Sequence, residues 1–454
     1  MRVDETEVAD LLAKASGGDG GADFFAQVRR SLRVAWERGG PSEASAGIDE
    51  GAGLRYRLGN SDRYAWCDGL DPSRLAGLLS QSSEAAAPGA PVPRVTPPKE
   101  EALETLEPLE SAQEWSEVLA VAESAALRNA PAGAEFSAVV HRTRERIWSA
   151  RPGGPLVTEE RFRGMVYLRV VARRSGRVSQ ASRVVAAGGA PGSCLARLEA
   201  GAVQAAEWVR RQGEGGAAPQ GEVPVVLGPW AAGVVLHEAV GHLLEADRAE
   251  DGSGPFAGRI GKPVAPEWLH LLEEGPDPED GLGGLDDEGR AVREWPLIEG
   301  GALRGFLTDG ATAEKLGLPP SGHGRRESYR YPCLPRMRRL ALRAASPSGA
   351  LEDSLDFGLW VTRVGGGRAA RGGSGVAFPV TEGFLVRNGR AAEPVQGAVL
   401  QGTPQEWLSA LEAAGDETEK TLGISLKAGQ SVAVSERMPS LRFRKLNVLG
   451  VETC

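Results

Sequence analysis

The sequence predicts an α+β fold in two domains, an N-terminal antiparallel sheet with helices followed by a β-rich half. At 454 residues the chain is longer than one hydrophobic core usually supports. Short segments that alternate apolar and polar residues recur in both halves, as strands with one buried face do. A glycine-rich stretch at 213–217 separates the halves, so we expect domains at 1–215 and 216–454.

Between residues 23 and 79 we expect a helix, three strands and a second helix. The stretches 32–36, 54–58 and 63–67 alternate apolar and polar residues and predict the strands. The run Asp71-Pro72-Ser73 predicts the start of the second helix, because aspartate caps helices and proline suits their first turn. Together these elements predict an antiparallel sheet backed by helices.

A segment rich in alanine and proline follows at residues 83–99. Proline lacks the N–H group that helices and sheets use, so we expect an exposed loop here. A proline-rich docking ligand is the alternative, and a plain connector is the preferred interpretation.

Two helices and two strands complete the N-terminal half. Ser111 and Glu114 have the spacing of a capping box and predict a helix start. The stretches 136–147 and 165–171 predict strands, and a long helix at about 195–211 closes this half.

The second half begins with a strand and a buried helix, then turns to short strands. The apolar run 225–227 predicts the strand, and the helix that follows it carries two of the five histidines of the chain. The stretches 297–298 and 303–307 flank a glycine turn. The dipeptide Asn388-Gly389 after 384–386 is a strong hairpin signal.

The histidines of this helix bracket a carboxylate in the pattern H-E-x-x-x-H, formed by His237, Glu238 and His242. Zinc proteases use H-E-x-x-H, in which both histidines share one helix face. On a regular helix the longer spacing places the second histidine about 140° around the axis. A π-bulge would restore a common face, and Gly241 would ease that distortion.

We therefore expect His237 and His242 to bind a zinc ion, with Glu238 as general base for the bound water. Two histidines and a carboxylate in an apolar run are costly to bury unless something pairs their polar groups, and a divalent metal would do so. The alternative is a buried helix with two hydrogen-bonded histidines, which a short motif by itself leaves open.

Composition excludes several other classes. A net charge of −9 argues against nucleic acid as the main partner. The acidic N-terminus lacks the apolar core of a signal peptide, and no run is long enough to span a membrane, so we expect a cytoplasmic protein. The four cysteines show no metal-binding or disulfide spacing, and they are Cys67, Cys194, Cys333 and Cys454.

Short blocks in a fixed order reveal a family resemblance. They are Leu236-His237-Glu238-Ala239-Val240-Gly241-His242 with Glu245 and Asp247, then Phe256-Ala257-Gly258-Arg259-Ile260-Gly261, Asp286-Asp287-Glu288-Gly289, Gly324-Arg325-Arg326-Glu327-Ser328-Tyr329, Pro335-Arg336-Met337, Gly365-Gly366-Gly367 and Lys427-Ala428-Gly429-Gln430-Ser431-Val432. In this order the chain resembles the TldD/PmbA family of metalloproteases, and in particular its TldD-like subunit. The resemblance is specific over about residues 220–450.

The resemblance implies a zinc peptidase that acts on peptide precursors or unfolded chains. It also implies a two-domain subunit that assembles as a homodimer, or as a heterodimer with a PmbA-like sister. In that family the partners enclose a chamber in which an extended peptide pairs with a strand.

One departure concerns the third zinc ligand, a cysteine in the family. Ser425 stands at the matching position, and a serine hydroxyl is a poorer zinc ligand than a thiolate. Cys454, Glu245, Asp247 and His323 are further candidates, and the two acidic residues are expected to orient a histidine instead. The alternative function is therefore a degenerate, non-catalytic subunit that serves as a dimer partner or peptide-binding scaffold.

Two other blocks allow two interpretations each. Arg325, Arg326 and Tyr329 are expected to line the cleft and to contact substrate backbone or a carboxylate. Alternatively, Arg326 and Glu327 form a structural ion-pair network around a tight turn. The acidic run 286–288 lacks the ligand pattern of a calcium loop and predicts a turn.

Overall fold

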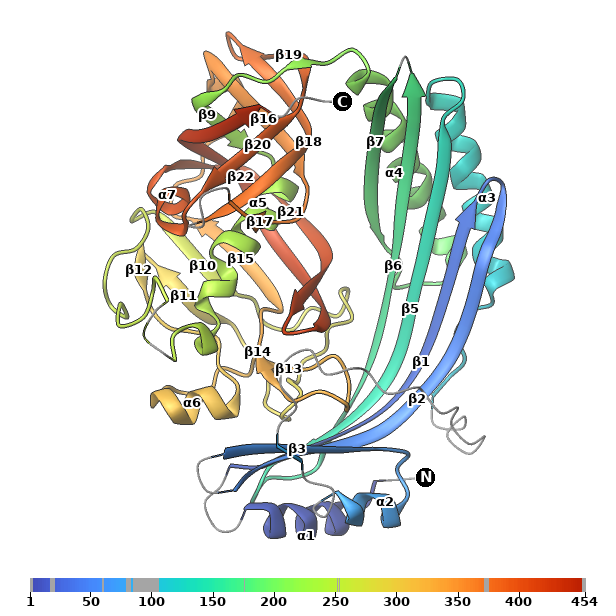
Figure 1. The fold of residues 1–454 in the computed structure, drawn as a ribbon, viewed down its shortest axis with the longest axis vertical. Coiled ribbons are helices and arrows are strands. Elements are labelled where there is room, and N and C mark those ends of the chain that lie inside the picture. The colour runs from blue at the N-terminus through green and yellow to red at the C-terminus, as the bar shows by residue number, and fades with distance from the viewer. Residues whose placement is uncertain are drawn as a thin grey trace.

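The computed structural model describes residues 3–16, 21–58, 61–78, 83–84, 106–174, 176–250, 252, 254–370 and 375–450. A tall curved sheet faces a second β-rich body across the molecule (Figure 1). This sheet has seven strands in the order β4-β3-β2-β1-β5-β6-β7. Their bounds are β1 Asp23–Glu37, β2 Gly40–Leu58, β3 Ser61–Asp68, β4 Ser83–Glu84, β5 Glu135–Ala150, β6 Val157–Arg174 and β7 Arg177–Ala186. The α+β architecture is thus as expected.

The helix expected near Asp23 is wrong, because this segment is the central strand β1. It pairs antiparallel with β2 on one side and β5 on the other over nearly its whole length. Phe24 and Phe25 point to opposite faces, and both are buried. Packing on two faces therefore decides the structure of this segment, which its local pattern does not reveal.

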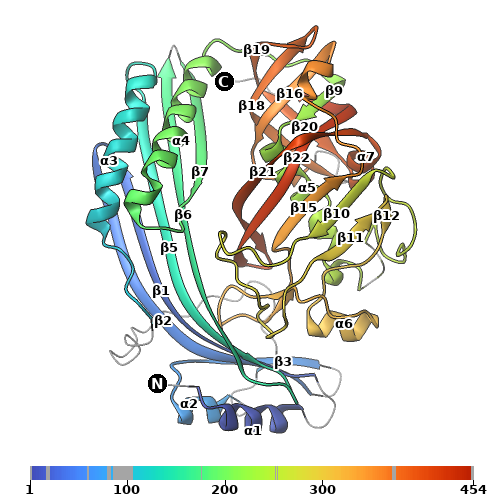
Figure 2. The same ribbon diagram turned by 180° about the vertical axis from the view of Figure 1, so that it is seen from behind.

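Helices cover the convex side and the lower end of this sheet (Figure 2). Their bounds are α1 Glu5–Ser16, α2 Pro72–Gly77, α3 Ala112–Asn129 and α4 Pro191–Gln212. Ser111 and Glu114 form the predicted capping box at the start of α3. The apolar faces of α3 and α4 pack on the sheet in one core with Trp115, Leu168 and Leu198.

The second sheet contains thirteen strands, most of them antiparallel. Its main path is β12-β11-β10-β15-β22-β9-β16-β18-β19-β8, and β17, β20 and β21 pair beside it. The bounds are β8 Gly216–Ala217, β9 Gly221–Leu227, β10 Leu269–Glu273, β11 Trp295–Glu299, β12 Ala302–Leu303, β15 Arg339–Ala344, β16 Phe357–Val364, β17 Arg368–Ala369, β18 Val376–Arg387, β19 Arg390–Gln396, β20 Ala398–Gly402, β21 Leu411–Lys427 and β22 Gln430–Gly450.

Long strands hold this second body together. Strand β22 pairs with β9, β15, β20 and β21, so it joins most of the sheet. The predicted hairpin at Asn388-Gly389 connects β18 and β19, and both turn residues have the positive φ of a tight turn. Short helices α6 (Gly310–Leu316) and α7 (Pro404–Ser409) and a small hairpin of β13 (Gly324–Arg325) with β14 (Leu334–Pro335) complete it.

Strands β1–β7 form the first sheet, and the strands of the second sheet all come from β8 onward, apart from the separate pair β13–β14. The change of sheet lies close to the predicted domain boundary, whose exact position stays a prediction. Of the proline-rich segment, Ser83–Glu84 pairs with β3 as β4, and residues 85–99 lie outside the described residues. Cys67, Cys194 and Cys333 are buried free thiols, whereas Cys454 lies outside the described part.

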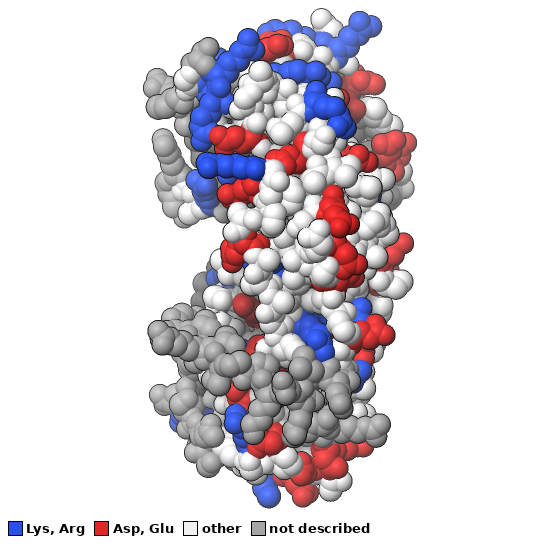
Figure 3. All heavy atoms as spheres, turned by 90° about the vertical axis from the view of Figure 1, so that its right-hand side faces the viewer, with Lys and Arg blue, Asp and Glu red and all other residues white. Residues whose placement is uncertain are grey.

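The face with α3 and α4 carries basic and acidic side chains side by side (Figure 3). This mixture is typical of a solvated surface. Among the helices in the described residues, none has both the length and the apolar character needed to cross a membrane.

Candidate metal centre

Helix α5 (Pro229–Ala239) ends between the two motif histidines. Val240 leaves helical geometry with φ −125° and ψ −51°, and a 3₁₀ helix over Gly241–Leu244 then carries His242. The expected π-bulge is therefore wrong. The chain does not insert an extra residue into a continuous helix but changes helix type, and the two imidazole rings come within 4.9 Å of each other, centroid to centroid.

Gly241 lies where this 3₁₀ helix packs on Met337. A Cβ at this position would overlap with Sδ of Met337, and Cδ2 of Leu340 would lie 3.3 Å from it. The φ angle of Gly241 is not positive, so its backbone conformation does not require glycine. The close packing against Met337 is the reason that only glycine fits here. The motif turn is thereby fixed against the segment that carries the Pro-Arg-Met block.

The two histidines and Glu238 form one cluster. Ligand atoms of His237, Glu238 and His242 all lie within 4.8 Å of one another. Both Nε2 atoms face the hydroxyl of Ser425, at 3.2 Å from His237 and 3.5 Å from His242. Ser425 therefore occupies the place at which the two imidazoles converge.

A carboxylate lies behind each imidazole. Nδ1 of His237 is 3.0 Å from Glu436, and Nδ1 of His242 is 3.0 Å from Glu245. Burial lowers the pKa of His237, but the hydrogen bond and charge of Glu436 outweigh burial and raise it overall. Histidines that bind metals commonly donate their second ring nitrogen in this way, which fixes the ring orientation.

Lys427 connects the acidic residues that follow the motif. Its Nζ lies 2.9 Å from Glu245 and 2.8 Å from Asp247, and it donates to the carbonyl of Pro335 at 2.9 Å. Burial raises the pKa of Glu245, but the hydrogen bond with His242 and the charge of Lys427 lower it to about 2. Glu245 thus lies behind His242, whereas Asp247 contacts Lys427, and the orienting role expected for both stays a prediction.

The β21–β22 hairpin places Ser425 and Lys427 at the centre. Consecutive residues alternate along β21, so Ser425 and Lys427 are buried while Ile424 and Leu426 face outward. Arg336 fixes the serine, because its guanidinium donates to the carbonyl oxygen at 2.9 Å and to the hydroxyl oxygen at 3.1 Å.

The donors fit a divalent metal. Two imidazole nitrogens are common zinc ligands, and a carboxylate oxygen of Glu238 lies within 4.8 Å of them. With neutral imidazoles the surrounding formal charge is −2, which a divalent ion balances. It arises from four carboxylates and two cations, namely Glu238, Glu245, Asp247, Glu436, Lys427 and Arg336.

His323, another candidate for a third ligand, does not belong to the cluster of His237, Glu238 and His242. His323 is fully buried, with Nε2 at 3.5 Å from Glu273 and Nδ1 at 3.0 Å from the carbonyl of Ser321. It therefore belongs to a separate buried pair. Cys454 lies outside the described residues, so its role as a ligand stays a prediction.

Two of the three predicted substrate contacts line a cavity of about 520 Å³, and they are Arg325 and Arg326. Arg326 pairs with Asp23 on β1, so its structural partner is not the expected Glu327. The hydroxyl oxygen of Tyr329 lies 2.9 Å from Asp49 and 2.5 Å from Asp68, and its single proton is donated to one of these carboxylates. Tyr329 lies outside the lining of this cavity in the described structure. Substrate contact stays a prediction for all three.

The acidic turn at 286–288 is buried and joins the two bodies. Glu288 lies 2.9 Å from Arg55 on β2, and Asp287 lies 2.7 Å from Arg161 on β6. The turn predicted from the sequence is present, and its carboxylates face arginines from the first sheet.

Sequence reasoning gave no role to Arg336, Lys427 and Glu436. Arg336 and Lys427 belong to the blocks that carried the resemblance, so their position was a usable signal. Glu436 had no local signal, because only the fold of β22 brings it to His237.

A partly buried histidine–glutamate–histidine cluster at the end of a helix, on a two-body α+β scaffold, is typical of a metallopeptidase-like protein. The sequence profile of the PmbA/TldA metallopeptidase C-terminal domain matches residues 220–450, and the chain belongs to this TldD/PmbA family.

Its relatives are named as metalloproteases. It is 36% identical over 238 residues to a metalloprotease TldD homolog of Haemophilus influenzae, covering 52% of this chain and 49% of that protein. It is 34% identical over 233 residues to a zinc metalloprotease TldD homolog of Saccharolobus solfataricus, covering 51% and 52%. The chain spans about half the length of the curated relatives it matches.

Solved structures share the fold over almost the whole chain. TldE from Thermococcus kodakarensis superposes with a TM-score of 0.76 at 19% identity, covering 98% of this chain and 99% of that one. A putative modulator of a DNA gyrase from Thermotoga maritima gives 0.74 at 18% identity, with the same coverage. At these identities the likeness shows the fold alone.

Proposed function

We propose that this protein is a zinc-dependent peptidase that hydrolyses peptide bonds of unfolded peptides or peptide precursors. One observation carries the proposal. Nε2 of His237 and Nε2 of His242 converge beside Glu238, and a carboxylate stands behind each imidazole. The names of its relatives in Haemophilus and Saccharolobus support the same class.

Each residue of the cluster would have a separate role in the reaction. His237 and His242 would hold the metal through Nε2, and Glu436 and Glu245 would keep both rings oriented. Zinc, when bound, would polarise the scissile carbonyl and lower the pKa of the attacking water. The Glu238 carboxylate would accept the proton of that water and return it to the leaving amine.

A second function is favoured by Ser425. Its hydroxyl occupies the convergence point of the imidazoles, where a thiolate would bind zinc more strongly. A chain with a weakened metal centre would serve as a dimer partner or a peptide-binding scaffold. The two functions differ in whether the purified protein holds zinc.

The assembly belongs to the same proposal. We expect a homodimer, or a heterodimer with a PmbA-like sister, since the fold is shared with a TldE protein. We expect the cytoplasm as its location, in keeping with three buried free thiols in the described chain.

Metal analysis and peptide cleavage test the proposed function. Wild-type protein, alone and mixed with the sister subunit, should contain stoichiometric zinc and cleave an unfolded peptide. Glu238→Gln should retain zinc and lose cleavage by about 10²- to 10⁴-fold. Glu250→Gln, at a partly exposed glutamate paired with Lys315, is the control. If the protein contains no zinc and cleaves no peptide, either alone or mixed with the sister subunit, the peptidase function is refuted and the function as a non-catalytic scaffold remains.

A further inference from the structure

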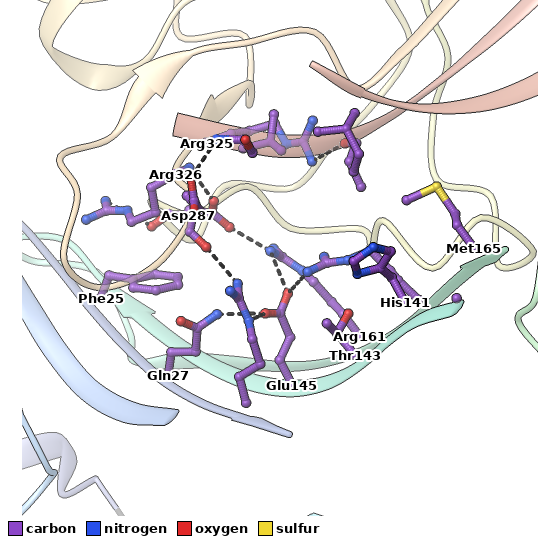
Figure 4. A pocket seen from close by; sticks show the side chains of 18 of the residues that line it. Phe25, Gln27, His141, Thr143, Glu145, Arg161, Met165, Asp287, Arg325 and Arg326 are labelled. Atoms are coloured by element: carbon purple, nitrogen blue, oxygen red, sulfur yellow. Dashed lines mark hydrogen bonds and ion pairs between the residues drawn. The ribbon is translucent and has the colours of Figure 1, made fainter. Parts of the chain in front are cut away.

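A cavity of about 520 Å³ lies between the first sheet and the β21–β22 hairpin (Figure 4). Strands β1, β5 and β6 form one wall with Gln27, Glu145 and Arg161, and Arg325 enters from the opposite side. Its mouth includes the exposed side chain of Ile424. The cavity is therefore built by both bodies and is open to solvent.

The lining of this cavity carries more positive than negative charge. Its cations are Arg29, Arg161, Arg163, Arg325 and Arg326, and its anions are Glu145, Asp287 and Glu327. Glu145 is shared, with Arg163 at 2.8 Å, Arg29 at 2.9 Å and Arg161 at 4.0 Å. Arg161 also pairs with Glu159 at 2.8 Å and with Asp287 at 2.7 Å, whereas Arg29 and Arg163 form ion pairs with Glu145 alone among the described residues. Arg29 and Arg163 therefore retain N–H groups for a second anion.

Arg325 is a buried cation without a carboxylate. Its guanidinium donates to the carbonyl oxygens of Met337 and Ala433, each at 2.6 Å, and no carboxylate among the described residues accepts from it. Burial, reinforced by Arg338, lowers its pKa well below the ordinary value. A buried charge without a counter-charge is unfavourable, and an anion in the cavity would compensate it.

Gln27 supplies a second, independent sign of a ligand. Its side chain is buried in the cavity wall, and its Nε2 donates to Glu145 at 2.6 Å. Its Oε1 is also buried and has no donor among the described residues. A buried acceptor of this kind is normally satisfied, so an N–H group of a ligand would complete it.

Arg29 and Arg163 are placed to receive that ligand. Their side chains are 20% and 17% exposed, so a ligand that arrives from solvent can reach them. Among the described residues, Arg163 makes its ion pair with Glu145 alone, although a guanidinium offers five N–H donors in a planar fork. Such a fork binds a carboxylate through two parallel hydrogen bonds.

The cavity adjoins the candidate metal centre through one hairpin. Ile424 lines the cavity, and the next residue, Ser425, faces the histidines from the other side of β21. Ser425 also pairs with Val432 of β22, which lines the cavity as well. A peptide held near the centre would therefore pass within reach of the cavity.

We propose that this cavity binds a carboxylate group of the peptide substrate through Arg29 and Arg163, opposite Arg325. The group is either an acidic side chain or the C-terminal carboxylate, because both offer the same planar pair of oxygens. The inference rests on the proposed function for the identity of the ligand as a peptide. It makes this chain selective for anionic peptides.

Peptide binding to the Glu238→Gln variant loaded with zinc tests this, because cleavage then does not interfere. Three dye-labelled peptides of one sequence serve as probes in fluorescence anisotropy. The first has a glutamate and an amidated C-terminus, the second has glutamine and a free C-terminal carboxylate, and the third has glutamine and an amidated C-terminus. At least one charged peptide should bind about tenfold more tightly than the neutral one, and the tighter of the two identifies the source.

Adding Arg163→Gln should reduce that preference to near unity, since Glu145 keeps its partners Arg29 and Gln27 and the fold is retained. Arg169→Gln is the matched control: it lies on the same strand and the same face, is bound to Gln180 at 2.6 Å, and does not line the cavity. The Arg169→Gln control should prefer the charged peptide to the same extent as the parent Glu238→Gln variant. The parent preference should also shrink at high salt.

Equal binding of the three peptides, binding of none, or an unchanged preference after Arg163→Gln would overturn the proposal. The outcome is separate from the proposed function. If wild-type protein binds a charged peptide preferentially but cleaves no peptide, the proposed carboxylate site is supported and the proposed peptidase activity is refuted. If the protein cleaves peptides but binds charged and neutral peptides equally, the peptidase activity is supported and the carboxylate site is refuted.

Discussion

The hydroxyl oxygen of Ser425 lies 3.2 Å from Nε2 of His237, between the two imidazoles that would hold a metal. Arg336 donates to the same oxygen at 3.1 Å. The side chain of Ser425 thus lies where a third metal ligand would lie, but it offers only a neutral hydroxyl group. A stronger ligand atom at this one position would therefore raise the metal affinity of the centre.

Replacing Ser425 with cysteine should tighten zinc binding by at least about tenfold, because a thiolate completes the tetrahedral set that a hydroxyl does not. Competition with a metal chelator measures the affinity, and cobalt substitution reports a thiolate ligand by its absorption. Ser425→Ala is the control and should bind zinc about as the wild type does. A cysteine variant with unchanged affinity would show that the imidazoles do not converge on a metal.

Replacing Glu436 with glutamine should weaken metal binding by about 10- to 100-fold, the usual effect of losing the carboxylate behind a ligating histidine. Glu436 contacts Nδ1 of His237 at 3.0 Å, so the ring loses its orienting partner. Glu419→Gln, at an exposed position on β21, serves as control. Isothermal titration with zinc gives both affinities, and equal values for the two variants would argue against this role.

Replacing Gly241 with alanine should destabilise the protein by about 1–3 kcal/mol, because the new methyl group overlaps with Met337. Combining it with Met337→Ala should cost less than the sum of the single changes, since the overlap is then removed. Denaturant unfolding measures the three values. Gly349→Ala, where nothing lies within 4 Å of an added Cβ, is the control. Strict additivity would contradict the packing explanation.

Glu288 predicts a pH dependence of stability. Burial raises its pKa to about 8, although Arg55 lowers it, and nearby carboxylates add to the rise. A carboxyl group with a folded pKa above its unfolded value of 4.5 stabilises fully below pH 4.5, and this contribution is lost as the pH rises through 8. Unfolding measured across this range should show the loss. It should disappear in Glu288→Gln and persist in Glu299→Gln, at an exposed position.

Local signals in the sequence were reliable where contacts are local. The capping box at Ser111 and the turn at Asn388-Gly389 each depend on a few neighbouring residues, and both were predicted. The apolar run of α5 likewise indicated the buried helix that carries His237.

Long-range contacts could not be predicted from the sequence. The segment from Asp23 becomes a strand because β2 and β5 enclose it, and no local pattern specifies those partners. Glu436 reaches His237 only through the pairing of β22. Gly241, which follows the change of helix type after Ala239, packs on Met337, about a hundred residues later in the chain.

The pairs Asp23–Arg326 and Arg55–Glu288 join residues about three hundred and two hundred positions apart, and all four side chains are buried. The matched family segment at 220–450 contains one member of each pair. Expressed as a fragment, this segment would expose Arg326 without Asp23 and Glu288 without Arg55, and it would also uncover the apolar surface around Tyr329. We therefore expect the smallest independently folded unit of this protein to be larger than the segment 220–450 that matches the family.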